Sequence, residues 1–258
     1  MDTAVTAEGP ARQLLPVLAA AVATVAVAVA GLRVSGLGVI DAIGFALVII
    51  WALAGTVVAR AADGAAHRGV YWLIMLGALT GAVALTAARL GAQDQGAQSQ
   101  TAGHHAARVL ATLAGPLVIA ISFHYLLALP DGRLGQPGRR LMAGLGYASA
   151  IGTGIGLAIA GRPFPLTAGA VIWPLAVLCA LPATRLRYLK AAGRDKERMQ
   201  WLGTGLVVAA TVALISAVLH LLVGWPESAG AVAASASAAV PIAVILAEWQ
   251  PLARHGGR

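Results

Sequence analysis

The chain has 258 residues, of which 59% are hydrophobic and 11% are charged, with a mean hydropathy of +0.81 and a formal net charge of +8. An average soluble domain is about 25% charged. A soluble fold of this length is therefore excluded, because it could not solvate its surface with so few charges, and the composition predicts an integral membrane protein. The single cysteine, Cys179, excludes an internal disulfide framework and a cysteine-based metal cluster.

Eight apolar segments are long enough to cross a hydrocarbon core of about 30 Å, which takes about 20 helical residues. The first is too long for the apolar region of a signal peptide. The sixth and eighth contain Pro174 and Pro241, which neighbouring helices can accommodate. We therefore predict an all-α, polytopic helical bundle over 14–249, between the tails 1–13 and 250–258. The predicted spans are about 14–32, 39–59, 70–90, 109–129, 141–160, 166–183, 201–224 and 229–249.

The basic residues predict the orientation of this bundle. If the N-terminus is cytoplasmic, 14 of the 18 lysines and arginines lie in inner segments. The four in outer segments are Arg33, Arg89, Arg108 and Arg162. This asymmetry follows the positive-inside rule. We expect both termini to be cytoplasmic, the cell membrane as the location, the lipid bilayer as a partner, and no nucleic acid.

Few ionisable side chains fall inside the spans, and each is a ligand or signal candidate because charge in hydrocarbon is costly. Asp41 opens the second span, His124 lies near the inner end of the fourth, and His220 lies near the outer end of the seventh. A histidine titrates near neutral pH and could respond to a signal. The alternative is a neutral histidine bonded to a neighbouring helix, and an interfacial carboxylate for Asp41 and for Glu248.

The sequence contains no catalytic constellation. A Walker lysine loop, a Gly-x-Ser-x-Gly elbow, an HExxH motif and an intramembrane carboxylate pair are all missing. The adjacent pair His104–His105 has no third ligand nearby in the sequence. We predict no catalytic residues, no cofactor and no metal site in this chain.

Two pairs of glycines at small-xxx-small spacing are expected to allow close helix packing. They are Gly77 with Gly81 in the third span and Gly152 with Gly156 in the fifth. The run 152–156 is not a phosphate loop, because no strand precedes it and it lies inside a predicted span.

Three patterns carry a resemblance to a known family: "HYLLALPDGRL" (124–134), "GRDKERMQWL" (193–202) and "LVGWPESAGAVAASASAAVPIAVILAE" (222–248). Together they resemble the N-terminal membrane region of actinobacterial two-component sensor histidine kinases with multi-span input domains. In that family a helix ends in a Pro-Asp-Gly-Arg inner turn, a basic segment enters a later helix, and a Trp-Pro outer turn precedes a small-residue helix. The resemblance covers about 109–258.

The resemblance implies a sensory input region that passes a signal, as helix movement, to a cytoplasmic kinase core and a response regulator. It also implies a homodimer. It assigns Asp131 and Arg133 to an inner turn, and Arg194, Arg198 and Trp201 to a coupling segment. The kinase core is absent from this chain, whose inner tail we expect to be truncated, so enzymatic activity stays open. A small multi-span transporter or permease and a non-catalytic structural membrane protein are the alternatives.

Overall fold

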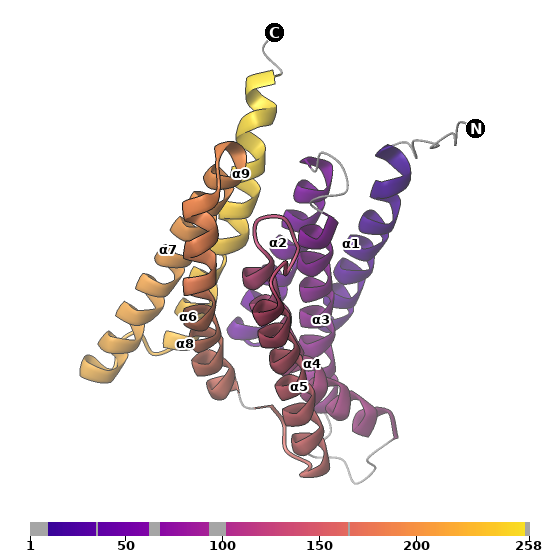
Figure 1. Cartoon of the computed structure of the whole chain (residues 1–258). Coiled ribbons are helices and arrows are strands. Elements are labelled where there is room, and N and C mark those ends of the chain that lie inside the picture. Colours follow the sequence, from indigo (N-terminus) through magenta and orange to yellow (C-terminus); the bar gives the residue numbers. More distant parts are fainter. Residues whose placement is uncertain (1–9, 35, 62–67, 93–101, 165, 256–258) are drawn as a thin grey trace.

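The computed structural model describes residues 10–34, 36–61, 68–92, 102–164 and 166–255, and these residues form helices and turns without any strand. The helices form an antiparallel bundle (Figure 1). Their bounds are α1 Pro10–Leu32, α2 Val39–Ala61, α3 Arg68–Ala92, α4 Ala102–Ala128, α5 Pro137–Ile159, α6 Leu166–Lys190, α7 Gly193–Val223, α8 Ala229–Ser237 and α9 Ala239–His255.

The helical prediction is confirmed, and seven stretches of the described residues are long and apolar enough to cross a membrane. They lie in α1, α2, α3, α4, α5 and α7 and across α8 and α9. The sixth predicted span falls on α6, where several side chains lie outside the described residues. The start of α1 and the end of α9 lie at the same end of the bundle (Figure 1). We call this the basic end, because α2 finishes there with Arg60 and α6 with Arg187 and Lys190.

Helix α3 has a central position and packs against α1, α2 and α4. Helix α4 also packs against α5 and α6, whereas α7 packs against α8 and α9. Helix α2 joins the two groups, because α8 and α9 pack on it. The core contains Phe45, Met75 and Leu127, each less than 2% exposed.

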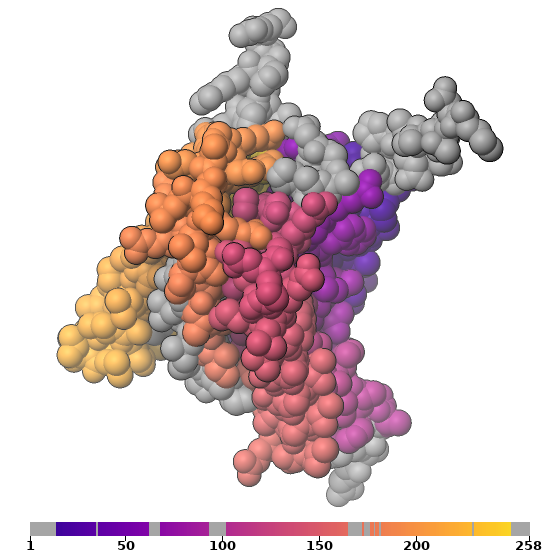
Figure 2. All heavy atoms as spheres, in the orientation of Figure 1, coloured from indigo at the N-terminus to yellow at the C-terminus, as the bar shows by residue number. Residues whose placement is uncertain are grey.

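The outer faces of α5 and α7 carry large apolar side chains that no described part of the chain covers. Leu141 and Ile159 of α5 and Leu214 and Leu221 of α7 are between 65% and 83% exposed. In Figure 2, α5 runs down the visible face and the far half of α7 projects at the left. A soluble monomer rarely exposes such large apolar surfaces. Exposure of this kind fits a protein whose surface is in contact with lipid.

The predicted eighth span is two helices, α8 and α9, separated at Ala238. Pro241 has no backbone N–H to donate to the carbonyl of Ser237, so the helical hydrogen-bond ladder is interrupted there. Gly205 of α7 faces this break. A Cβ on Gly205 would lie 2.8 Å from the carbonyl oxygen of Ala239 and 2.8 Å from the Cβ of Ala243. Only a glycine lets the two helices approach this closely.

The helices at the basic end are longer than the apolar segments. Helix α6 continues to Lys190 and α7 begins at Gly193, so most of the stretch between the sixth and seventh predicted spans is helical. Only Ala191 and Ala192 separate the two helices. Polar helical turns that extend past an apolar segment have no hydropathy signal. For this reason α6 continues beyond the end of the sixth predicted span and α7 begins before the start of the seventh.

Candidate functional site

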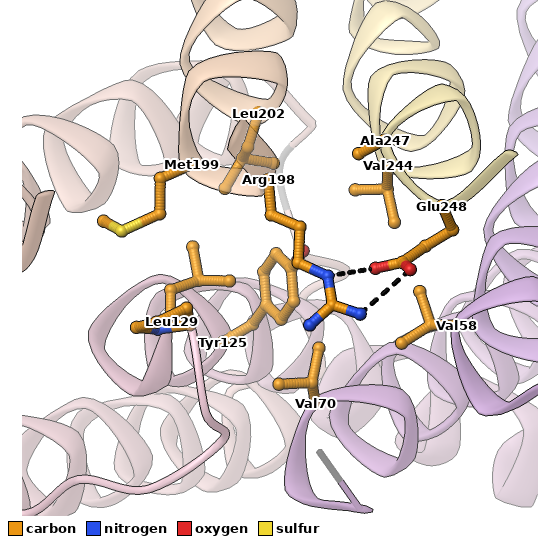
Figure 3. Close-up of a pocket in the computed structure, with 11 residues that line it drawn as sticks. Val58, Val70, Tyr125, Leu129, Arg198, Met199, Leu202, Val244, Ala247 and Glu248 are labelled. Atoms are coloured by element: carbon orange, nitrogen blue, oxygen red, sulfur yellow. Dashed lines mark hydrogen bonds and ion pairs between the residues drawn. The ribbon is translucent and has the colours of Figure 1, made fainter. Parts of the chain in front are cut away.

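Three segments that lie far apart in the sequence meet at the basic end around one small cavity, which we call the basic-end junction (Figure 3). The cavity has a volume of about 40 Å³, which is room for about one water molecule. Each of the three patterns that carry the family resemblance contributes to its wall. The lining consists of Tyr125, Leu129 and Pro130, then Arg198, Met199 and Leu202, then Val244, Ala247 and Glu248, with Val58 of α2 and Val70 of α3.

A buried carboxylate with two arginines forms the polar part of the junction. Glu248 of α9 is 3% exposed. Arg198 of α7 approaches it with Nε 2.5 Å from Oε1 and Nη2 2.9 Å from Oε2. Arg194 places its own Nη2 3.0 Å from Oε2. Figure 3 shows the Arg198 side chain extending from α7 toward Glu248. Paired arginines are what a buried carboxylate requires, because an uncompensated buried charge is costly.

The spacing of the two arginines explains why both reach the same carboxylate. Arg194 and Arg198 are four residues apart on α7, so they lie on one face of the helix. That face packs against α9. Asp195, in the first turn of α7, also lies 3.5 Å from Arg198, at a helix end where a carboxylate is electrostatically favoured. The four charges form a network rather than one isolated pair.

A second set of arginine contacts, all made by Arg187, holds the turn at the end of α4. Arg187 of α6 donates from Nη1 to Oδ1 of Asp131 at 2.7 Å and from Nη2 to the carbonyl of Arg133 at 2.6 Å. Nη1 also donates to the carbonyl of Ala128 at 3.0 Å and to that of Leu129. The last carbonyls of a helix have no partner within it and carry partial negative charge. Arg187 therefore caps α4 from a different helix.

The same turn rests directly on the start of α3. Gly132 has φ +74°, which favours glycine. A Cβ on Gly132 would lie 2.6 Å from the backbone nitrogen of Val70, and a Cβ on Gly69 would lie 2.5 Å from the carbonyl oxygen of Gly132. Two glycines thus let the backbones of the turn and of α3 touch. On the other side, Arg139 of α5 donates to the carbonyl of Ala183 in α6 at 3.0 Å.

Both predicted histidines have partners that account for them structurally. His124 of α4 lies with Nδ1 3.1 Å from the hydroxyl of Tyr147 on α5, and the two rings meet edge to face. His220 lies at the opposite end, where its Nδ1 is 2.9 Å from the carbonyl of Pro226. His124 therefore joins two helices, and His220 closes a turn. The described residues contain no group of three or more potential metal ligands.

Asp41 also has a structural partner at the opposite end. Arg89 of α3, 9% exposed, lies with Nη1 2.5 Å from Oδ2 of Asp41. Its other nitrogens donate to the carbonyls of Gly31, in the last turn of α1, and of Val34, just after α1, at 3.2 and 2.7 Å. Arg89 thus joins α1, α2 and α3 in the way that Arg187 joins α4, its turn and α6.

The two glycine pairs have different surroundings. A Cβ on Gly77 would lie 3.4 Å from Ile121, and one on Gly81 would lie 3.1 Å from Val48, so this pair packs against neighbouring helices. Gly152 and Gly156 have nothing within 4 Å of the same position. The second pair therefore makes no close approach to another helix in the described part of the chain.

The predicted coupling segment is in the junction, although its central partner was missed. Arg194 and Arg198 both bind Glu248, and Trp201 is half-buried one turn further along α7. The interpretation of Glu248 as an interfacial carboxylate is wrong, because Arg194 and Arg198 of α7 contact its side chain and Glu248 is only 3% exposed. A sequence signal for this site does exist. Two arginines four residues apart, Arg194 and Arg198, lie just before one predicted span, and a carboxylate, Glu248, ends the next span.

Comparisons of the chain with protein-family models, with curated proteins and with solved structures give no match.

Proposed function

We propose that this chain is the membrane-embedded input region of a two-component sensor histidine kinase in the cell membrane, with the basic end of the bundle in the cytoplasm. One observation carries the proposal. The three patterns that resemble such kinases, which are separated by tens of residues in the sequence, line a single junction at the basic end.

The junction offers a route for a signal through the last helix. Helix α9 is held to α7 by Glu248 and packs on α2. A change in the position of α7 relative to α2 therefore moves α9 or breaks the Glu248 network. In the proposed protein, α9 leads to the kinase core. A change in the position of α9 would therefore change the fraction of the kinase that is phosphorylated.

The proposal includes a homodimer, because kinases of this type act as dimers. The exposed glycines of α5 give a surface on which helices of two copies could approach closely. Cross-linking of the protein in native membranes tests this part separately.

The transporter alternative has less support in the described residues. A permease requires a polar route near the middle of the membrane, whereas two hollows in the described residues, of about 40 and 180 Å³, both have mostly apolar linings. Ser216, a buried polar residue of α7, donates to the carbonyl of Val212 in its own helix.

The deciding experiment begins with the gene beyond the codon for Arg258. An open reading frame that continues into a phospho-accepting helix and an ATP-binding domain supports the proposal. The full-length product is then reconstituted in liposomes with ATP labelled at the γ-phosphate. Glu248→Gln is expected to change autophosphorylation severalfold, while Glu227→Gln, at an exposed glutamate of the opposite end, leaves it unchanged. A stop codon after Arg258 without an adjacent response-regulator gene contradicts the proposal.

A further inference from the structure

A second hollow lies between α1 and α2, near the basic end. It has a volume of about 180 Å³, and the described side chains that line it are Leu14, Val17 and Leu18 of α1, and Thr56, Val57 and Arg60 of α2. This is roughly six times the share of liquid volume that one water takes, about 30 Å³. Its two helices both qualify as membrane spans.

The chemistry of the lining favours hydrocarbon over water. Four of the six side chains are aliphatic, and the hydroxyl of Thr56 already donates to the carbonyl of Leu53 in its own helix at 2.7 Å. Water in such a space would find few of the two to four polar partners it requires. A crevice on a membrane helix pair borders the acyl chains, so an acyl chain is the natural occupant.

Among the described side chains of the lining, the charged group is Arg60, and it sets the chemistry at the mouth of the crevice. Arg60 lies in the last turn of α2 and is exposed. An arginine near the end of a membrane helix extends its guanidinium to the headgroup level. A guanidinium binds phosphate through paired hydrogen bonds. The guanidinium therefore favours an anionic lipid over a zwitterionic lipid, whose headgroup carries a positive charge of its own.

We propose that the crevice between α1 and α2 binds one anionic phospholipid, with an acyl chain along Leu18 and Val57 and the phosphate on Arg60. Charge complementarity and the apolar lining together select this occupant. The site is independent of the proposed kinase function, because it uses none of the residues of the basic-end junction.

The test uses the whole 258-residue chain, purified in detergent and incubated with an equimolar mixture of phosphatidylglycerol and phosphatidylcholine. Native mass spectrometry then counts the lipids that stay bound. The wild type is expected to retain phosphatidylglycerol preferentially. Arg60→Gln is expected to lose this preference by about fivefold, the factor that corresponds to the roughly 1 kcal/mol that one arginine contributes near an anionic surface.

Two further variants separate a site from general attraction. Arg68→Gln removes an equal charge from the exposed start of α3 at the same end and is expected to keep the preference. Val57→Phe fills the crevice and is expected to reduce retention of both lipids. The proposal is overturned if the wild type shows no preference, if Arg60→Gln keeps it, or if Arg68→Gln reduces it as much. Size-exclusion profiles confirm that each variant is folded.

Discussion

Arg198 of α7 and Glu248 of α9 are 50 residues apart in the sequence and form an ion pair, with a hydrogen bond of 2.9 Å from Nη2 to Oε2 and Nε 2.5 Å from Oε1. Their side chains are 13% and 4% exposed. This pair is the most buried part of a network at the basic-end junction, in which Arg194 also reaches Glu248 and Asp195 also reaches Arg198. Removing Glu248 leaves the buried guanidinium of Arg198 with only the more distant Asp195 as a counter-charge.

Replacing Glu248 by Leu is expected to lower the free energy of unfolding by about 3 kcal/mol, since breaking a buried pair costs about 3–5 kcal/mol. The double variant Glu248→Leu/Arg198→Met removes both charges and is expected to recover most of the loss. Denaturant titration in mixed micelles measures both. Glu227→Gln, at an exposed site, is expected to stay within about 0.5 kcal/mol of the wild type. Equal losses in the single and double variants would show that the pair does not act as a unit.

Arg89→Lys is expected to destabilise the opposite end by about 1–3 kcal/mol. The guanidinium of Arg89 serves Asp41 and the carbonyls of Gly31 and Val34 together, and a lysine ammonium cannot reproduce this planar arrangement of donors. The matched control is Arg33→Lys, at an exposed arginine of the same end. Thermal unfolding in detergent compares the two. The role given to Arg89 is wrong if both variants unfold at the same temperature as the wild type.

Gly132→Ala is expected to destabilise the turn after α4 by more than about 1 kcal/mol. The new Cβ would lie 2.6 Å from the backbone nitrogen of Val70, and the φ of +74° disfavours any side chain. Gly144→Ala in α5 is the control, because nothing lies within 4 Å of its Cβ position. Alanine there is expected to be neutral or to stabilise by about 0.5–1 kcal/mol. The same thermal measurement decides, and a tolerated Gly132→Ala would contradict the contact with α3.

Gly205→Val is expected to separate α7 from the break between α8 and α9. Its side chain would meet the carbonyl of Ala239 and the Cβ of Ala243, and overpacking of this kind typically costs about 1–3 kcal/mol. Gly203, two residues earlier on the same helix, has nothing within 4 Å, so Gly203→Val should have a much smaller effect. Unfolding of both variants in detergent tests the difference. Matching losses would place the cost in helix propensity instead of packing.

Cysteines at Gln136 and Glu227, in a Cys179→Ala background, are expected to react from opposite sides of the membrane. Both positions are exposed, and they lie at the two ends of the bundle. With the proposed orientation, a membrane-impermeant maleimide labels the Glu227 position in intact cells and the Gln136 position only after permeabilisation. Labelling of both in intact cells would exclude the topology.

Hydropathy was sufficient to predict the helical bundle and its long apolar helices, because long apolar runs are local signals. The extensions of α4, α6 and α7 were not predictable in this way. The segment from Gly193 to Gln200 is polar, and whether such residues continue a helix depends on what they contact. Here Arg194 and Arg198 contact Glu248. These contacts stabilise the helical conformation of the polar segment at the start of α7.

The candidate site was predictable only in part, because sequence position gives depth along a helix and not the identity of neighbours. Asp131 and Arg198 were selected from short patterns, and both lie at the basic end. Asp131 is on the turn after α4, and Arg198 is in the junction. Glu248 was assigned to the interface from its place at a span end, yet α7 covers it. Arg187 was counted only as a topology residue, although it caps α4. Such partners come from helices 50 or more residues away, and no local pattern records them.

The interruption at Pro241 has a mechanical consequence for the last helix. Bending a continuous helix requires hydrogen bonds on one side to lengthen, whereas at this level the bond from residue 241 to residue 237 is already missing. The free energy needed to tilt α9 against α8 is therefore lower here than elsewhere in the pair. Gly205 packs against this point and Glu248 joins α7 to α9 near the basic end, so we expect any tilt of α9 about the break to carry the basic end of α7 with it.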